Sequence, residues 1–139
     1  MYYFVEPEVA GGWGDGTLAD TSVHPPVVNK LHYHFDDWLG DDLLETFPCF
    51  IVSEKLKDDI VGSGLTGFEI DDVLVTMSDD FELPAGVSIF PNFYWLKAKK
   101  TDQAVDFKIS ADNRLMVSSG ALAVMKRHSL SHADIDPIS

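Results

Sequence analysis

Residues 50–71, FIVSEKLKDDIVGSGLTGFEID, and residues 115–136, LMVSSGALAVMKRHSLSHADID, align without a gap at an offset of 65 positions. The identical positions are Val52 and Val117, Ser53 and Ser118, Leu65 and Leu130, Ile70 and Ile135, and Asp71 and Asp136. Each copy predicts a strand, a helix capped by its serine, and a loop that ends in acid-Ile-Asp. A true repeat would lay two equivalent helices on one sheet. Coincidental similarity between two strand–helix units is the alternative.

The segments around the repeat are mostly β in pattern. Leu31, Tyr33 and Phe35 alternate with polar residues, which predicts a half-buried strand over residues 27–35. Further strands are expected at residues 2–5, 49–52, 68–77, 92–97, 105–109 and 114–117, with the last two forming a hairpin. Residues 36–45 are expected to form a turn and a short helical piece, and the last helix is expected to run to about residue 128.

Together these elements predict an α+β fold, with a mainly antiparallel sheet and two short helices. At 139 residues the chain fits a single domain covering residues 1–139. Residues 7–26 are rich in glycine and proline and are expected to form a long irregular loop, with Trp13 as its apolar plug.

Several global features indicate the cytoplasm. No apolar run approaches the roughly 20 residues that a membrane helix requires, and the N-terminus lacks the pattern of a signal peptide. The single cysteine, Cys49, cannot form an internal disulfide, in agreement with a reducing compartment.

The charge balance is strongly acidic. Asp and Glu number 23 against 10 Lys and Arg, which gives a formal net charge of −13. Such a field repels nucleic acid and anionic membranes, because phosphates need cationic partners. It would steer a basic protein into contact. Acidity that serves only solubility is the alternative.

Motifs of catalysis are missing from the sequence. Gly62-Ser63-Gly64 is too short for a phosphate-binding loop and no lysine follows it. Cys49 lies in an apolar run, where an inert buried thiol is the expected state. The protein is therefore expected not to be an enzyme and to need no cofactor.

Two histidines offer an alternative. His32 and His34 would lie on one face of a strand, and Asp36 could add an oxygen ligand, as in a metal-binding enzyme. These residues do not complete a tetrahedral site. We therefore expect no metal and retain the metal-binding enzyme as the runner-up hypothesis.

Acidic and apolar residues alternate most densely between Phe35 and Phe47. An aromatic anchor ringed by charge is typical of a protein-interaction site. The residues expected to bind a partner are Asp36, Asp37, Trp38, Asp41, Asp42 and Glu45. The alternative is that Trp38 belongs to the core and only the acids face solvent.

Short motifs along most of the chain resemble a bacterial immunity family, immunity family eleven, whose members are encoded beside polymorphic toxins or secretion-system effectors. The motifs are Met1-Tyr2-Tyr3, Glu6-Pro7, Gly11-Gly12, Gly16-Thr17, residues 38–44, 47–53 and 65–68, Phe93-Tyr94-Trp95-Leu96 and Ala133-Asp134-Ile135. None of these motifs is a chemical signature.

The resemblance implies a cognate toxin or effector that is bound and neutralised in the cytoplasm. The acidity suggests that this toxin is basic, as a nuclease is. A subunit that binds some other protein is a further alternative. The sequence gives neither the oligomeric state nor the identity of the toxin.

Overall fold

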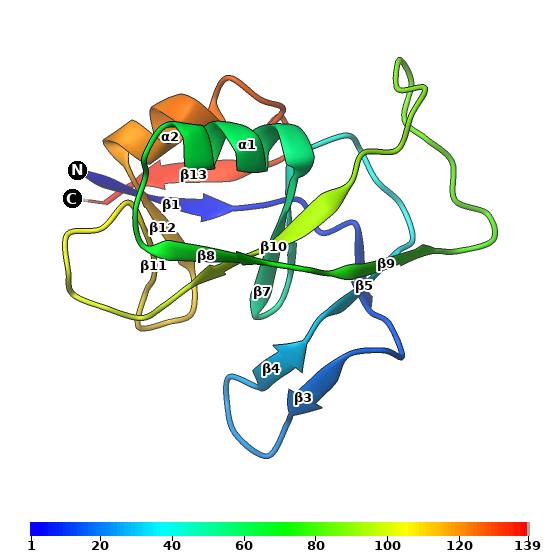
Figure 1. Cartoon of the computed structure of the whole chain (residues 1–139), viewed down its shortest axis with the longest axis horizontal. Helices are drawn as coiled ribbons and strands as arrows, with labels where there is room; N and C mark the ends of the chain where they lie inside the picture. The colour runs from blue at the N-terminus through cyan, green and yellow to red at the C-terminus, as the bar shows by residue number, and fades with distance from the viewer. Residues whose placement is uncertain (139) are drawn as a thin grey trace.

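The computed structural model describes residues 1–138 and shows an α+β fold with mainly antiparallel strand pairing (Figure 1), as the sequence predicted. One four-stranded sheet has the order β11 (Phe107–Ile109), β12 (Leu115–Ser118), β1 (Tyr2–Glu6), β13 (Asp134–Pro137). The other has the order β6 (Leu43–Thr46), β7 (Cys49–Ser53), β10 (Phe93–Ala98), β8 (Phe68–Asp71). The two helices, α1 (Glu54–Gly62) and α2 (Ser119–Met125), contact each other.

The two four-stranded sheets are equivalent strand by strand. In one half, β7 and β8 flank α1 in sequence and both pair with β10; in the other, β12 and β13 flank α2 and both pair with β1. The registers match: Tyr94 lies opposite Val52 as Tyr3 lies opposite Val117, and Leu96 lies opposite Ile70 as Val5 lies opposite Ile135. The repeat seen in the sequence is therefore a repeat of structure. Each helix follows a strand of its own sheet, so the expectation of one shared sheet was wrong.

Serine caps both helices, as predicted. The side-chain oxygen of Ser53 accepts a hydrogen bond from the Leu56 amide, and that of Ser118 accepts one from the Ala121 amide. A cap of this kind satisfies one of the free amides in the first turn. The helices therefore start at equivalent positions in the two halves.

Strands β1 and β10 connect the two sheets. Beyond the end of β1, the Glu8 carbonyl accepts a hydrogen bond from the amide of Glu45 in β6, at 2.9 Å. Beyond the end of β10, the Lys99 carbonyl accepts one from the amide of Ile109 in β11, also at 2.9 Å. Beyond its own sheet, β1 thus bonds to β6, an edge strand of the other sheet, and β10 likewise bonds to the edge strand β11.

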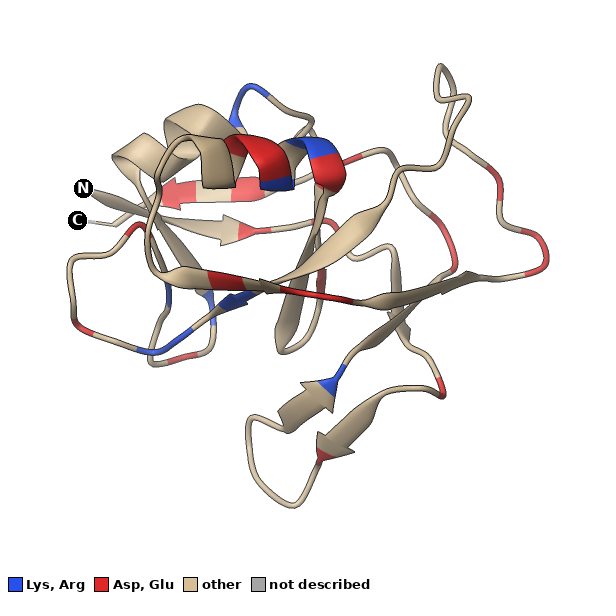
Figure 2. Ribbon diagram, in the orientation of Figure 1, with Lys and Arg blue, Asp and Glu red and all other residues tan. Residues whose placement is uncertain are grey.

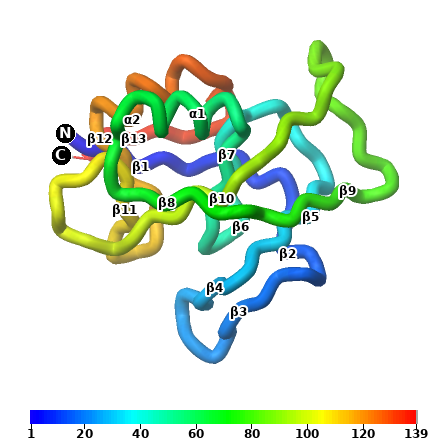
Figure 3. The backbone as a smooth tube through the Cα atoms, in the orientation of Figure 1, coloured from blue at the N-terminus to red at the C-terminus, as the bar shows by residue number. Residues whose placement is uncertain are grey.

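Both chain ends lie together in one sheet. β1 pairs with β13, and the Ile138 amide donates to the Tyr2 carbonyl at 2.9 Å. The ends are side by side in the backbone trace (Figure 3). The N-terminal strand β1 therefore belongs to the same sheet as the C-terminal strands β11, β12 and β13.

A smaller three-stranded sheet extends the fold beyond the repeat. It has the order β2 (Gly11–Trp13), β5 (His32–Phe35), β9 (Leu74–Met77), and β3 (Leu18–Asp20) pairs with β4 (Val27–Lys30) in a projecting arm (Figure 1). β5 and β9 are parallel. The loop between β2 and β3 follows the His32 ring closely, because a Cβ atom on Gly14 would lie only 2.2 Å from that ring. Residues 7–26, expected as one irregular loop, thus contain β2 and β3, because these segments pair with β5 and β4. Trp13 packs against the apolar core, in agreement with its expected role as a plug.

The apolar core has two parts. The first lies between the repeated halves and draws on both, for example through Leu56 with Ile60 and Ala121 with Met125. The second lies beneath the three-stranded sheet and is largely aromatic, with Tyr33, Phe35 and Trp38 buried. Among the described residues, no helix is long and apolar enough to cross a membrane.

Some sequence-based boundaries were wrong. Residues 36–45 contain no helix, because Leu43 and Leu44 enter strand β6 and both become buried. Residues 27–35 form two strands, β4 and β5, because only β5 joins the three-stranded sheet. The last helix ends at Met125. The second acid-Ile-Asp segment, expected as the end of a loop, forms β13, whereas the first lies in β8, within the strand expected at residues 68–77. Residue 139 of the expected domain lies outside the described residues.

Candidate protein-interaction surface

Two loops leave the three-stranded sheet at the same end. Because β5 and β9 are parallel, with Phe35 opposite Met77, the chain exits from both strands in one direction. The Ser78 amide donates to the Phe35 carbonyl at 2.9 Å and continues this pairing. The loops of residues 36–42 and 78–92 therefore lie beside each other, and a Cβ atom on Gly40 would contact Pro84 at 3.6 Å.

An aromatic cluster supports both loops. Phe35 packs edge-on against Phe90, with ring centroids 5.0 Å apart, and Phe90 packs against Trp38 at 5.4 Å and Phe81 at 5.8 Å. Phe93 of β10 completes the cluster beside Trp38, at 5.8 Å. Edge-to-face ring pairs of this kind add stability beyond simple burial. The loops rest on a well-packed base.

The surface formed by these loops and by Met77 at the end of β9 exposes acids together with apolar side chains. Its exposed acids are Asp36, Asp37, Asp79, Asp80 and Glu82, and its exposed apolar residues are Leu39, Met77, Leu83 and Ile89. We call these nine residues the acidic loop surface. Figure 2 shows Asp and Glu along both loops, and neither loop contains Lys or Arg.

The six residues expected to bind a partner are divided by the structure. Asp36 and Asp37 are exposed on the acidic loop surface. Trp38 is 4% exposed and Asp41 is 0% exposed, so the proposed aromatic anchor is a core residue. Trp38 turns inward because the aromatic cluster surrounds its ring and its Nε1 donates to the Asp41 carbonyl at 2.9 Å.

Asp42 and Glu45 belong to other surroundings. Asp42 is half-buried, and its carboxylate accepts hydrogen bonds from Ser53 and from the Ser129 amide. Glu45 is half-buried in β6 and lines a separate cleft, to which no residue of the two loops contributes. Burial, reinforced by the charge of Glu6, raises the pKa of Glu45 to about 7.

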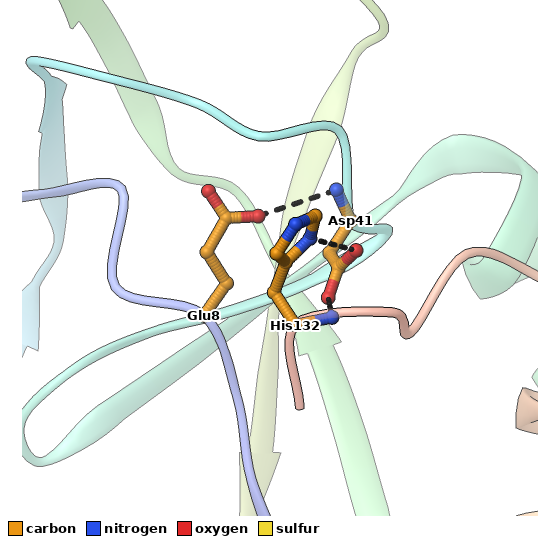
Figure 4. Close-up of side chains that lie close together, drawn as sticks. All are labelled: Glu8, Asp41 and His132. Atoms are coloured by element: carbon orange, nitrogen blue, oxygen red, sulfur yellow. Dashed lines mark hydrogen bonds and ion pairs between the residues drawn. The ribbon is translucent and has the colours of Figure 1, made fainter. Parts of the chain in front are cut away.

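A buried carboxylate network fixes the first loop from below. Glu8, Asp41 and His132 meet from three distant segments (Figure 4). Glu8 accepts hydrogen bonds from the Leu39 and Asp41 amides. Asp41 accepts hydrogen bonds from both the amide and the ring Nδ1 of His132, at 2.9 and 3.1 Å. Burial raises the pKa of Glu8, although its bonds to the two amides oppose the rise.

The same three side chains have the composition of a metal site. One ligand-type atom from each lies within 4.8 Å of the others. However, all four carboxylate oxygens already accept hydrogen bonds, and Oδ1 of Asp41 accepts a further one from the Ser129 hydroxyl. This arrangement supports a structural role, because these hydrogen bonds join the segments that contain Glu8, Asp41 and His132.

His32 and His34 do share one face of β5, as predicted, and Thr76 of β9 lies between them. The Nδ1 atom of His32 accepts a hydrogen bond from the Gly16 amide at 2.8 Å, so the ring hydrogen must lie on Nε2. Nε2 then donates to the Thr76 hydroxyl at 2.6 Å, which in turn donates to Nδ1 of His34 at 2.7 Å.

Asp36 lies near the His34 end of this chain of hydrogen bonds. Its carboxylate lies 3.8 Å from Nε2 of His34. The three residues of the metal hypothesis are thus neighbours, but both ring nitrogens of His32 are used in hydrogen bonds. The geometry supports a role in holding β9 and the β2–β3 loop against β5.

Cys49 is buried in β7. Burial raises the pKa of its thiol to about 12, so the group is protonated at neutral pH. A protonated, buried thiol is a poor nucleophile, which agrees with the inert state expected from the sequence.

Most of the acidic loop surface was not among the residues expected from the sequence. Asp79, Asp80, Glu82, Leu83 and Ile89 follow β9, 40 or more positions beyond Asp36. Residues 79–91 contain Pro84, Gly86 and Pro91, a composition typical of a loop, but only the parallel pairing of β5 with β9 brings this segment to Asp36. No protein-family model matches the chain, and no curated protein matches it.

Proposed function

We propose that this protein is an immunity protein that binds a basic toxin or secretion-system effector in the cytoplasm and neutralises it without catalysing a reaction. The observation that carries this proposal is the acidic loop surface, where apolar side chains stand among acids on a rigid base. The resemblance of the sequence to an immunity family is a separate support. Neither depends on the other.

Charge gives the surface its selectivity. Its five exposed acids have no Lys or Arg in either loop to neutralise them. In a chain with a formal net charge of −13, this end attracts a cationic protein and repels an anionic one. Steering of this kind speeds association and weakens as salt is added. A toxin that acts on nucleic acid must itself be cationic, and therefore fits this surface.

The exposed apolar side chains supply contact area. Leu39 is 53% exposed and Leu83 is 37% exposed, on the two loops that meet at Gly40 and Pro84. Ile89 is 79% exposed near the other end of the second loop. Burying such side chains against a partner contributes about 25 cal/mol for each Å² of apolar area removed from water. The acids around them form the polar rim of a protein interface.

Preorganisation lowers the cost of binding. Trp38 and Phe90 pin the two loops to the same aromatic cluster, and the Glu8–Asp41–His132 network holds the first loop from behind. A surface that is already ordered loses less conformational entropy when a partner binds. The buried residues of the original six therefore contribute to binding by shaping the loops.

The test is co-expression with the toxin or effector encoded by a neighbouring gene. We expect growth to be rescued and a stoichiometric complex to form at moderate salt. The variant Asp36→Lys with Asp79→Lys should slow association at least about tenfold at low salt. Leu39→Ser with Ile89→Ser should mainly speed dissociation, because apolar contacts act after the encounter.

A matched control separates this surface from overall charge. Asp20→Lys with Asp102→Lys changes the net charge equally at two exposed positions outside the acidic loop surface. Equal slowing by both double variants would show that the surface has no special role. Absence of a complex would remove the proposed function, and a stable complex with a protein that is not toxic would identify an interaction subunit instead.

A further inference from the structure

Two clefts occupy equivalent places in the repeated halves. One lies along β10 at Trp95, Leu96 and Lys97, and the other along β1 at Phe4, Val5 and Glu6. These positions correspond in register, because Trp95 lies opposite Asp71 as Phe4 lies opposite Asp136. We name them the β10 cleft and the β1 cleft.

The two clefts have opposite charge. The β10 cleft is lined by two lysines, Lys97 and Lys100, and by no acid. The lining of the β1 cleft contains five acids and a single cation; these residues are Glu6, Glu45, Asp112, Asp134, Asp136 and Arg114. A cationic cleft on a chain with a net charge of −13 contrasts with the rest of the molecule.

The walls of the β10 cleft are apolar. Cys49 and Trp95 are both buried and form part of its floor, and Pro25 and Pro26 line it from the turn that leads into β4. The volume of the cleft is about 250 Å³. Apolar walls with a few convergent polar groups are typical of small-molecule sites.

The lysines at this cleft have spare capacity for an anion. Nζ of Lys97 lies 4.7 Å above the Trp95 ring and 3.3 Å from the Asp71 carboxylate. Lys100 is exposed. Among residues 1–138, no carboxylate lies within 4 Å of its ammonium group. One ammonium is thus partly neutralised and the other is unpaired.

A third polar group completes the lining. The side-chain oxygen of Asn113, a residue that lines both clefts, is buried and accepts no hydrogen bond from the described part of the chain. A buried acceptor without a partner destabilises the folded chain. A ligand O–H or N–H in the cleft would give this acceptor a partner.

We propose that the β10 cleft binds a small organic carboxylate with an apolar body. The carboxylate meets Lys100 and Lys97, the apolar body lies on the Trp95 side of the cleft between the prolines, and a donor group on the ligand reaches Asn113. The equivalent β1 cleft rejects the same ligand, because its acids repel the carboxylate. This site is independent of the acidic loop surface and of the proposed function.

The experiment titrates the purified chain with 4-hydroxyphenylacetate, which has a carboxylate, an aromatic ring and an O–H donor. Calorimetry and amide chemical shifts should show saturable binding, with shifts at Cys49 and Trp95 and none at Glu6 or Asp134. The neutral amide of the same compound should bind at least about tenfold more weakly, since hydrogen bonds to a charged group are stronger than those between neutral groups.

Matched variants test the role of charge. Lys100→Met should weaken binding of 4-hydroxyphenylacetate about tenfold. Lys99→Met, an exposed neighbour outside this cleft, should leave binding unchanged. Both positions are exposed, so both variants should fold, which circular dichroism will verify. The proposal is overturned if no binding saturates below about 10 mM, if acid and amide bind equally, or if the two variants behave alike.

Discussion

Asp42 and Asp106 hold the same place in the two halves of the fold. Asp42 accepts a hydrogen bond from the Ser53 hydroxyl at 2.7 Å, and Asp106 accepts one from Ser118 at 2.6 Å. The second oxygen of Asp42 accepts from the Ser129 amide at 2.8 Å, and that of Asp106 accepts from the Thr66 amide, also at 2.8 Å. Each carboxylate therefore connects the helix cap of its own half to the loop after the helix of the other half.

This symmetry predicts similar losses of stability in the two halves. Ser53→Ala and Ser118→Ala each remove a helix cap and a bond to the aspartate, so each should lower the free energy of unfolding by about 0.5–2 kcal/mol. Urea unfolding followed by circular dichroism measures the change. Ser88→Ala, at an exposed loop position, is the control and should have little effect. If only one of the two serine variants lowered the free energy of unfolding, the two caps would be alike in geometry but not in their contribution to stability.

The raised pKa of Glu45 predicts a loss of stability with rising pH. The folded chain holds this proton more tightly than the unfolded chain, since the pKa is about 7 when folded against an ordinary 4.5. The Glu45 proton therefore contributes fully to the free energy of unfolding below about pH 4.5. This contribution is lost as the pH rises through about 7. Glu45→Gln should flatten the decline and make the protein more stable at pH 8. Parallel pH profiles for the variant and the original chain would show that Glu45 does not carry the effect.

Packing of the β2–β3 loop on His32 predicts different outcomes for two neighbouring glycines. Gly14→Ala would place a Cβ atom 2.2 Å from the His32 ring and should cost about 1–3 kcal/mol. Gly12→Ala meets nothing within 4 Å and should be close to neutral. Thermal unfolding of both variants checks the difference. Equal stability would mean that the loop moves away from His32 at little cost.

Buried Asp41 and exposed Asp37 should differ in how strongly their replacement lowers stability. Asp41→Ala leaves the amide of His132 and the hydroxyl of Ser129 without their acceptor, and should cost about 2–4 kcal/mol. Asp37→Ala alters an exposed side chain and should change stability by less than about 0.5 kcal/mol. Chemical denaturation at pH 7 compares them. A mild effect of Asp41→Ala would show that water replaces the lost carboxylate.

Much of the fold could be predicted because its signals are local. Serines followed by helical patterns located both helices, and alternating apolar residues located most strands. The aligned copies even indicated the repeat, since Val52 with Val117 and Ile70 with Ile135 occupy equivalent strand positions. Local propensity and packing agree at these positions.

The rest depends on contacts between distant segments. Leu43 and Leu44 were expected in a helical piece, but pairing with β7 draws them into β6. Trp38 was among the residues expected to bind a partner, with a place in the core as the alternative; Phe90 and Phe93, more than 50 positions away, enclose it in the core. The acidic loop surface likewise follows from the parallel pairing of β5 and β9, which no local pattern reveals.

The adjacency of the chain ends has a consequence for how the fold can be connected. In one half, β8 continues through residues 72–92 into β10, whereas in the other the corresponding strands, β13 and β1, meet at the two ends of the chain. A short linker from residue 138 to residue 1, with new ends opened in the exposed loop at residues 102–104, would keep every strand pair intact. The fold is therefore suited to circular permutation, after which each half would be continuous in sequence.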